Sequence, residues 1–108
     1  QWTLMQRTRS LESDWQPERF DVIVVWSKKF KEKLCKRVIG LPGETVKVIQ
    51  GKIYINGREL ADSFGNGKMD IPAMTIAPDH VWVIGDNRED SIFGHFPIKD
   101  ILGKVVLY

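Results

Sequence analysis

Lys36 is the residue whose surroundings point most directly to chemistry. It lies within a run of alternating residues, 34–39, in which Lys36 and Val38 would share one side of an extended strand. If that side is dry, the ammonium form is disfavoured and the pKa of the lysine falls. A neutral amine can take a proton from a serine hydroxyl and so act as a general base. The competing interpretation is a lysine on a solvated strand face, which is the commoner situation.

A second stretch, residues 81–91, leads from an apolar run into polar residues. Residues 81–84 are apolar, Gly85, Asp86 and Asn87 follow, and Ser91 comes four residues later. Taken alone, these residues are typical of a tight turn in which side chains bond to their own backbone. By itself the pattern assigns no role to Ser91.

Together, the two stretches resemble the motifs of type I signal peptidases. The lysine box of that family is matched by residues 36–44, KRVIGLPGE, and its later box by residues 85–91, GDNREDS. Three further segments match the family in kind and order: 17–25, 51–57 and 101–105. The resemblance therefore covers nearly the whole chain, and several ordered boxes with a lysine make it specific.

The resemblance implies a serine–lysine dyad in which Lys36 is the general base. The serine matched by Ser91 hydrogen-bonds the lysine amine and helps to orient it. Supporting roles fall on Arg37, Asp86 and Asn87. The cleavage segment of an exported precursor would pair as an added strand beside Lys33, Leu34 and Cys35.

The chain departs from the family pattern in three places. The family's nucleophilic serine belongs to a motif whose end is matched by residues 3–4, which would place that serine two positions before Gln1. We therefore expect the nucleophile either to precede this chain or to be absent from the protein. Phe20 stands where the family usually has glycine. After Ser91 the usual Asp-Ser-Arg element is missing, so Arg37 is expected to need another partner.

Composition limits the other function classes. The chain has 108 residues, enough for one domain with its own core, and 43% of them are apolar and 28% charged. Its formal net charge of +2 is too small to favour nucleic-acid binding. The single cysteine, Cys35, rules out an internal disulfide and a cysteine-rich zinc site, and two histidines fifteen positions apart do not make a zinc site alone. No cofactor or metal is expected, and no apolar run approaches the roughly 20 residues of a membrane-spanning helix.

The apolar pattern is short and strand-like throughout. Strands are expected over 21–26, 34–39, 45–49, 52–55, 58–60, 81–84 and 104–108. Asn56 and Gly57 predict a two-residue hairpin turn, residues 98–102 a single helical turn, and residues 61–78 a surface excursion. These elements predict an all-β fold: one domain over 1–108, a mixed β-barrel or sandwich of the signal peptidase catalytic type, without a large second β domain.

Aromatic and basic residues raise the question of a membrane contact. Trp26 and Trp82 lie on apolar runs and are expected in the core. Trp2 is the better candidate for a membrane contact. The lysine cluster within residues 28–33 is interpreted either as a solvated loop or as a surface that faces anionic lipid or substrate.

Three functions are compatible with these features. The leading one is a membrane-associated serine endopeptidase that removes signal peptides from exported precursors, held at the extracytoplasmic face by an anchor upstream of Gln1. The alternative is a signal-peptidase-like protein without catalysis that binds or assembles surface polymers such as pili. The third is a self-cleaving regulator related to the repressor proteases, whose DNA-binding domain no basic or helical segment here supplies.

Overall fold

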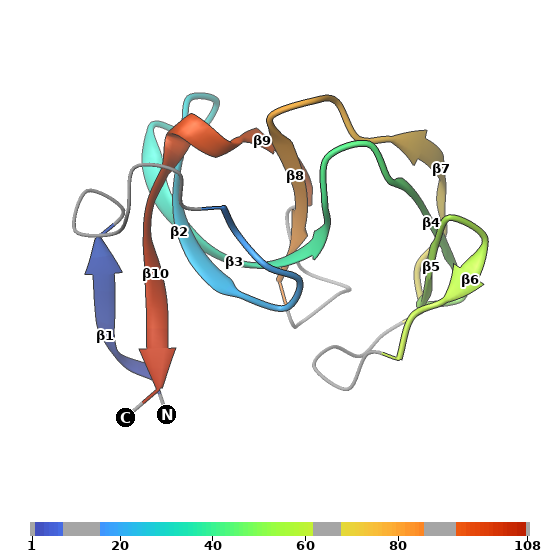
Figure 1. The fold of residues 1–108 in the computed structure, drawn as a ribbon, viewed down its shortest axis with the longest axis horizontal. Helices are drawn as coiled ribbons and strands as arrows, with labels where there is room; N and C mark the ends of the chain where they lie inside the picture. The colour runs from blue at the N-terminus through green and yellow to red at the C-terminus, as the bar shows by residue number, and fades with distance from the viewer. Residues whose placement is uncertain (1, 8–15, 62–67, 86–92, 108) are drawn as a thin grey trace.

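The computed structural model describes residues 2–7, 16–61, 68–85 and 93–107. Within these residues the chain forms two antiparallel sheets that lie beside each other, and β3 leads from one to the other (Figure 1). The six-stranded sheet has the order β1 (Trp2–Arg7), β10 (Ile101–Leu107), β2 (Val22–Ser27), β3 (Glu32–Gly40), β8 (His80–Ile84) and β9 (Gly94–Pro97). The four-stranded sheet has the order β6 (Arg58–Glu59), β5 (Lys52–Ile55), β4 (Thr45–Ile49) and β7 (Ile71–Thr75).

The expected all-β class is confirmed, and the sheets are open rather than closed into a barrel. In the described part of the chain, β1 and β9 form the edges of the larger sheet, and β6 and β7 those of the smaller one. The helical turn expected over 98–102 is a 3₁₀ turn at Ile98–Asp100, directly before β10. Among the described residues no helix is both long and apolar enough to cross a membrane.

Two tight turns fix the register of the smaller sheet. Asn56 and Gly57 both adopt positive φ angles, of 52° and 85°, and Ile55 pairs with Arg58 across them. This is the two-residue hairpin turn that the sequence predicts, because only such residues reach that conformation at low cost. The preceding turn, at 50–51, has the same geometry between β4 and β5.

The prediction of a surface excursion over 61–78 is wrong for its second half. Residues 71–75 form β7, which pairs with β4, and both Ile71 and Ile76 are buried. β7 escaped the sequence reasoning because it is an edge strand with an irregular register, so only isolated residues face the core. β1 and β9, also edge strands, were not expected either.

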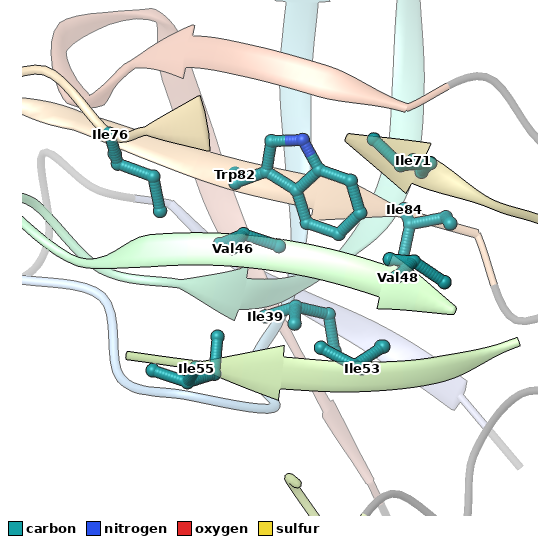
Figure 2. Close-up of a cluster of buried hydrophobic side chains, with 9 residues drawn as sticks. All are labelled: Ile39, Val46, Val48, Ile53, Ile55, Ile71, Ile76, Trp82 and Ile84. Carbon is teal, nitrogen blue, oxygen red and sulfur yellow. The ribbon is translucent and has the colours of Figure 1, made fainter. Parts of the chain in front are cut away.

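Two clusters of buried side chains hold the sheets together. The first fills the space between the two sheets (Figure 2) and consists of Ile39, Val46, Val48, Ile53, Ile55, Ile71, Ile76, Trp82 and Ile84. The second lies on the other face of the larger sheet and consists of Ile23, Val25, Val38, Val81, Val83 and Ile101. β3 serves both clusters, because successive side chains of a strand point to opposite faces.

The two tryptophan predictions have different outcomes. Trp82 is fully buried in the first cluster, as expected. Trp26 is 38% exposed, so its assignment to the core is wrong. It lies one residue before the end of β2 and pairs with the exposed Lys33, next to the β2–β3 turn. The structure does not describe the side chain of Trp2, so its membrane contact stays a prediction.

Candidate active site

Lys36 lies in the middle of β3 on an apolar face. It pairs in register with Ile23 of β2, and residues directly opposite each other in an antiparallel pair share a face. Ile23 and Val38, which lies on the same face two residues along β3, are both fully buried. The lysine itself is half-buried. The structure thus confirms the strand position and the side of the strand on which the sequence placed the amine.

The surroundings of Lys36 favour its neutral form. Burial among apolar side chains lowers the pKa of its amine from the ordinary value of 10.5, and the neighbouring Cys35 thiol partly opposes this. The cause is desolvation, because an ammonium group loses water contacts that aliphatic side chains cannot replace. The shift is in the direction that a general base requires.

Arg37, the next residue, points to the opposite face and is buried, with 5% of its surface exposed. Its Nη1 atom donates a hydrogen bond to the Phe20 carbonyl at 2.8 Å. Arg37 pairs with Val22 on one side and Ile84 on the other. The Phe20 carbonyl is therefore a hydrogen-bond partner of Arg37, which was expected to need one because the Asp-Ser-Arg element is missing.

A bidentate ion pair anchors the end of β3. The guanidinium group of Arg19 donates to both carboxylate oxygens of Glu44 at 2.7 and 2.8 Å, and to the Ile39 carbonyl at 2.8 Å. The same carboxylate accepts the Leu41 backbone N–H at 2.8 Å. These bonds tie the turn before β2 to the turn after β3, so they hold the strand of Lys36 in place. Sequence reasoning missed this role, although Arg19 and Glu44 both lie within matched motifs.

The hydrogen bonds to Glu44 also set its charge state. The side-chain bond with Arg19 lowers the pKa of Glu44 below its ordinary value of 4.5, the Leu41 N–H adds to this, and burial opposes it. The same bond raises the pKa of Arg19. Both groups therefore remain charged at neutral pH, as a two-point arginine–carboxylate contact requires.

The topology brings the two sequence motifs together. The last residue of β8, Ile84, pairs with Arg37, so the later motif begins beside the lysine box. Three predicted site residues, Asp86, Asn87 and Ser91, lie outside the described residues. Their roles stay predictions.

The predicted substrate-binding segment lies in the accessible half of β3. Lys33 and Cys35 are exposed and Leu34 is half-buried, whereas every residue of β3 from Arg37 onward is buried. On its other side, β3 pairs with β8 through Arg37, Val38 and Gly40. Within the described part of the chain, no group of three or more His, Cys, Asp or Glu side chains could hold a metal ion.

Comparison with known proteins agrees with this arrangement. The family described as "Signal peptidase, peptidase S26" matches residues 1–108. The chain is 35% identical over 105 residues to a signal peptidase I of Leptolyngbya laminosa, covering 84% of this chain and 52% of the relative. It is 32% identical over 100 residues to a probable signal peptidase I-2 of Synechocystis, covering 82% and 46%.

The fold gives the same result. A crystal structure of a signal peptidase I from Enterococcus faecalis matches with a TM-score of 0.73 at 26% identity, covering 87% of this chain and 100% of that one. A signal peptidase I of Bacillus caldolyticus is 35% identical over 107 residues, which cover 81% of this chain and 58% of the relative. The chain spans about half the length of the curated relatives that it matches.

Proposed function

This chain belongs to the signal peptidase family S26, and we propose that it supplies the lysine of a serine–lysine endopeptidase that removes signal peptides from exported precursors. The observation that carries the proposal is the position of Lys36, which lies mid-strand on a face of fully buried aliphatic residues. Burial there lowers the pKa of the amine, which is the direction that a general base requires.

The chemistry follows from a neutral amine beside a serine hydroxyl. The serine oxygen attacks the scissile carbonyl carbon while the Lys36 amine takes the hydroxyl proton. The resulting ammonium group then gives that proton to the leaving amine as the peptide bond breaks. A water molecule then gives a proton to the same amine and attacks the ester carbonyl carbon, and the ammonium group returns that proton to the serine oxygen as the ester bond breaks. In this scheme the nucleophile comes from the part of the protein before Gln1, and Ser91 orients the amine.

The accessible half of β3 supports a place for the precursor. An extended peptide can add to a sheet as a further strand, with main-chain hydrogen bonds for affinity and pockets for alternate side chains. We assign this role to Lys33, Leu34 and Cys35, which precede Lys36 and are exposed or half-buried. The scissile bond would then lie at the level of Lys36. Asp86, Asn87 and Arg37 would brace the site from the later motif and from the opposite face.

The proposal includes a membrane setting. Precursors carry their apolar signal segment in or near the bilayer, so we place the site at the extracytoplasmic membrane surface, held by an anchor in the remaining part of the protein. The partners are then exported precursors and the lipid surface. Binding or assembly of surface polymers, such as pili, is the function that the same fold would have without catalysis.

The test compares cleavage of a membrane-targeted precursor by the full-length protein and by its Lys36→Ala variant. Removing the base should lower the rate about 10³-fold or more, judged from the loss of a triad member in serine proteases. Lys47→Ala, which removes an exposed lysine of β4, is the matched control and should leave the rate unchanged. Equal rates for wild type and Lys36→Ala would remove Lys36 from the mechanism. Binding of precursor or pilin without cleavage would favour the assembly function.

A further inference from the structure

The two histidines of the chain, His80 and His95, lie side by side although fifteen positions separate them in the sequence. His80 begins β8, and His95 is on β9, the edge strand that pairs antiparallel with β8 (Figure 1). His80 pairs with Pro97 and His95 pairs with Trp82, which makes the histidines diagonal neighbours on one face of the sheet. The centres of their rings are 6.5 Å apart.

A hydrogen bond fixes the tautomer of His80. Its Nδ1 atom lies 2.8 Å from the Pro78 carbonyl oxygen. A carbonyl oxygen can only accept, so Nδ1 carries the proton and donates it, and the lone pair of the neutral ring is on Nε2. A metal-binding histidine commonly makes this contact, in which one nitrogen donates to a backbone carbonyl while the other binds the ion. His80 is thus held in the form that a metal ion at Nε2 requires.

The surroundings of His95 favour a neutral ring. Partial burial lowers the pKa of its imidazole below the ordinary value of 6.5, and the charge of the nearby His80 lowers it further. Both effects disfavour the protonated ring, which loses water contacts and is repelled by a like charge. A protonated imidazole has no lone pair for a metal ion, so the neutral ring is the form that binds. His95 therefore keeps a lone pair available at neutral pH.

The separation of the two rings is close to that of a pair bound to one ion. A Zn–N bond is about 2.0–2.1 Å long, which places the centre of each imidazole about 3.2 Å from the ion. At the tetrahedral angle, two such ring centres are about 5 Å apart. The rings of His80 and His95 are 6.5 Å apart. Rotation of the side chain of His95, which is exposed, can supply the remaining approach of about 1 Å.

An ion can reach the pair from solvent. His80 lines an open cavity of about 520 Å³, and Asp79 and Lys99 line the same cavity with one negative and one positive charge. Across the described ranges, no third His, Cys, Asp or Glu completes a set of metal ligands with these two. The site therefore has two imidazole ligands, and water fills the other coordination positions.

We propose that His80 and His95 bind a divalent transition-metal ion, with Zn²⁺ as the representative, and that the ion links the edge strand β9 to β8. Imidazole suits Zn²⁺, Ni²⁺ and Cu²⁺, whereas Mg²⁺ and Ca²⁺ prefer oxygen ligands. The last residue of β8, Ile84, pairs with Arg37, so about 13 Å of strand separates the histidine pair from the lysine motif. The ion stabilises the sheet and takes no part in cleavage, so this proposal does not depend on the proposed function.

The experiment is isothermal titration calorimetry of the full-length protein with ZnCl₂, with circular dichroism as the check that each variant is folded. The wild type should bind one equivalent of Zn²⁺ through this pair. His80→Gln and His95→Gln should each weaken that binding about 10²-fold or more, because a single imidazole lacks the linked second ligand. Zn²⁺ binding by either variant that equals that of the wild type would overturn the proposal.

Two controls separate ligation from a general effect of charge. Lys99→Gln changes the charge of the same cavity without removing an imidazole, and it should bind Zn²⁺ at least as tightly as the wild type. A loss equal to that of the histidine variants would mean that any change at this surface disturbs binding, which would overturn the proposal. MgCl₂ should give no binding. Mg²⁺ affinity equal to that of Zn²⁺ would show that imidazole is not the ligand.

Urea unfolding tests the link between the two strands. An ion that binds only the folded protein stabilises it, so saturating Zn²⁺ should raise the urea midpoint of the wild type. The midpoint of the double variant, His80→Gln with His95→Gln, should not change. An equal rise in both proteins would overturn the proposal. Lys36→Ala should bind Zn²⁺ like the wild type, so the failure of the catalytic proposal and the failure of this one are distinguishable.

Discussion

The two halves of β3 belong to one strand but differ in what covers them. Residues 32–36 are exposed or half-buried, and their described pairs are with β2. Residues 37–40 are all buried: three of them, Arg37, Val38 and Gly40, pair with β8, and Ile39 packs against side chains of the smaller sheet. Lys36 and Arg37 stand at the boundary. The comparison shows that the last side chain of the open half, Lys36, is attached directly to a buried half that is packed on both faces.

Lys36→Met should have the largest effect of the variants considered, and that effect should be on activity rather than on stability. Cleavage by the full-length protein should fall about 10³-fold or more, because thioether sulfur cannot accept the proton. Stability should not fall. The folded-state pKa of Lys36 is lowered below its unfolded value of 10.5, so the unfolded chain binds the proton more tightly and the charged lysine disfavours folding.

Because the charged form of Lys36 disfavours folding, the stability difference between wild type and Lys36→Met should depend on pH. The cost of the charged lysine is fully present below its folded-state pKa and disappears as the pH rises to 10.5, so wild-type stability gains relative to Lys36→Met over that window. Urea unfolding of both proteins at neutral pH and near pH 10.5 measures it. If the difference in unfolding free energy between the two proteins does not change with pH, the amine is solvated in the folded protein.

Gly40→Ala tests the buried half. A Cβ atom there would lie 2.2 Å from Ile76 Cδ1 and 2.8 Å from Val46 Cγ2, which is closer than carbon atoms can pack. We expect a loss of about 1–3 kcal/mol in unfolding free energy, typical of an overpacked core. Cleavage per folded molecule should change little.

Ile76→Val provides the matched test for Gly40→Ala, because valine lacks the Cδ1 atom of the closest contact. The double variant should lose less stability than the sum of the two single variants. Additive losses would mean that the strain lies elsewhere.

Glu44→Gln tests the Arg19–Glu44 ion pair, which links the turn before β2 to the turn after β3. We expect a loss of about 1 kcal/mol at neutral pH, the scale of a partly exposed charged hydrogen bond. The folded-state pKa of Glu44 is lowered, so its contribution is present above the unfolded value of 4.5 and is lost as the pH falls through the folded pKa. Urea unfolding at neutral and acidic pH should show the variant converging on the wild type in acid. A constant difference would contradict the ion-pair explanation.

The smallest effect concerns the backbone next to Arg37. Phe20 adopts a φ angle of 73°, a left-handed conformation that glycine reaches without strain and a residue with a side chain does not. Its N–H donates to the Val38 carbonyl at 2.7 Å, so the turn is tied to the buried half of β3. Phe20→Gly should be about 1 kcal/mol more stable than Phe20→Ala, because both lose the ring and only alanine keeps the strain. Equal stability by urea unfolding would show that the turn relaxes.

Much of the site could be predicted because it rests on local patterns. Alternation placed Lys36 on a strand and on one side of it, and the positive-φ turn at Asn56 and Gly57 follows from their residue types. Trp26 could not be placed in this way, because an apolar run does not show that its last residues lie beside an exposed turn. The roles of Asp86, Asn87 and Ser91 lie beyond the described residues and stay predictions.

The sequence by itself determined the family, the all-β class and the strand position of Lys36, the proposed base. Each is written in short-range patterns: ordered motifs, alternating strands and two-residue turns. Only the tertiary structure decided what covers each residue. The burial of Ile71 and Ile76, the Arg19–Glu44 ion pair and the proximity of the His80 and His95 rings all depend on contacts between segments far apart in the chain, and local pattern does not encode such contacts.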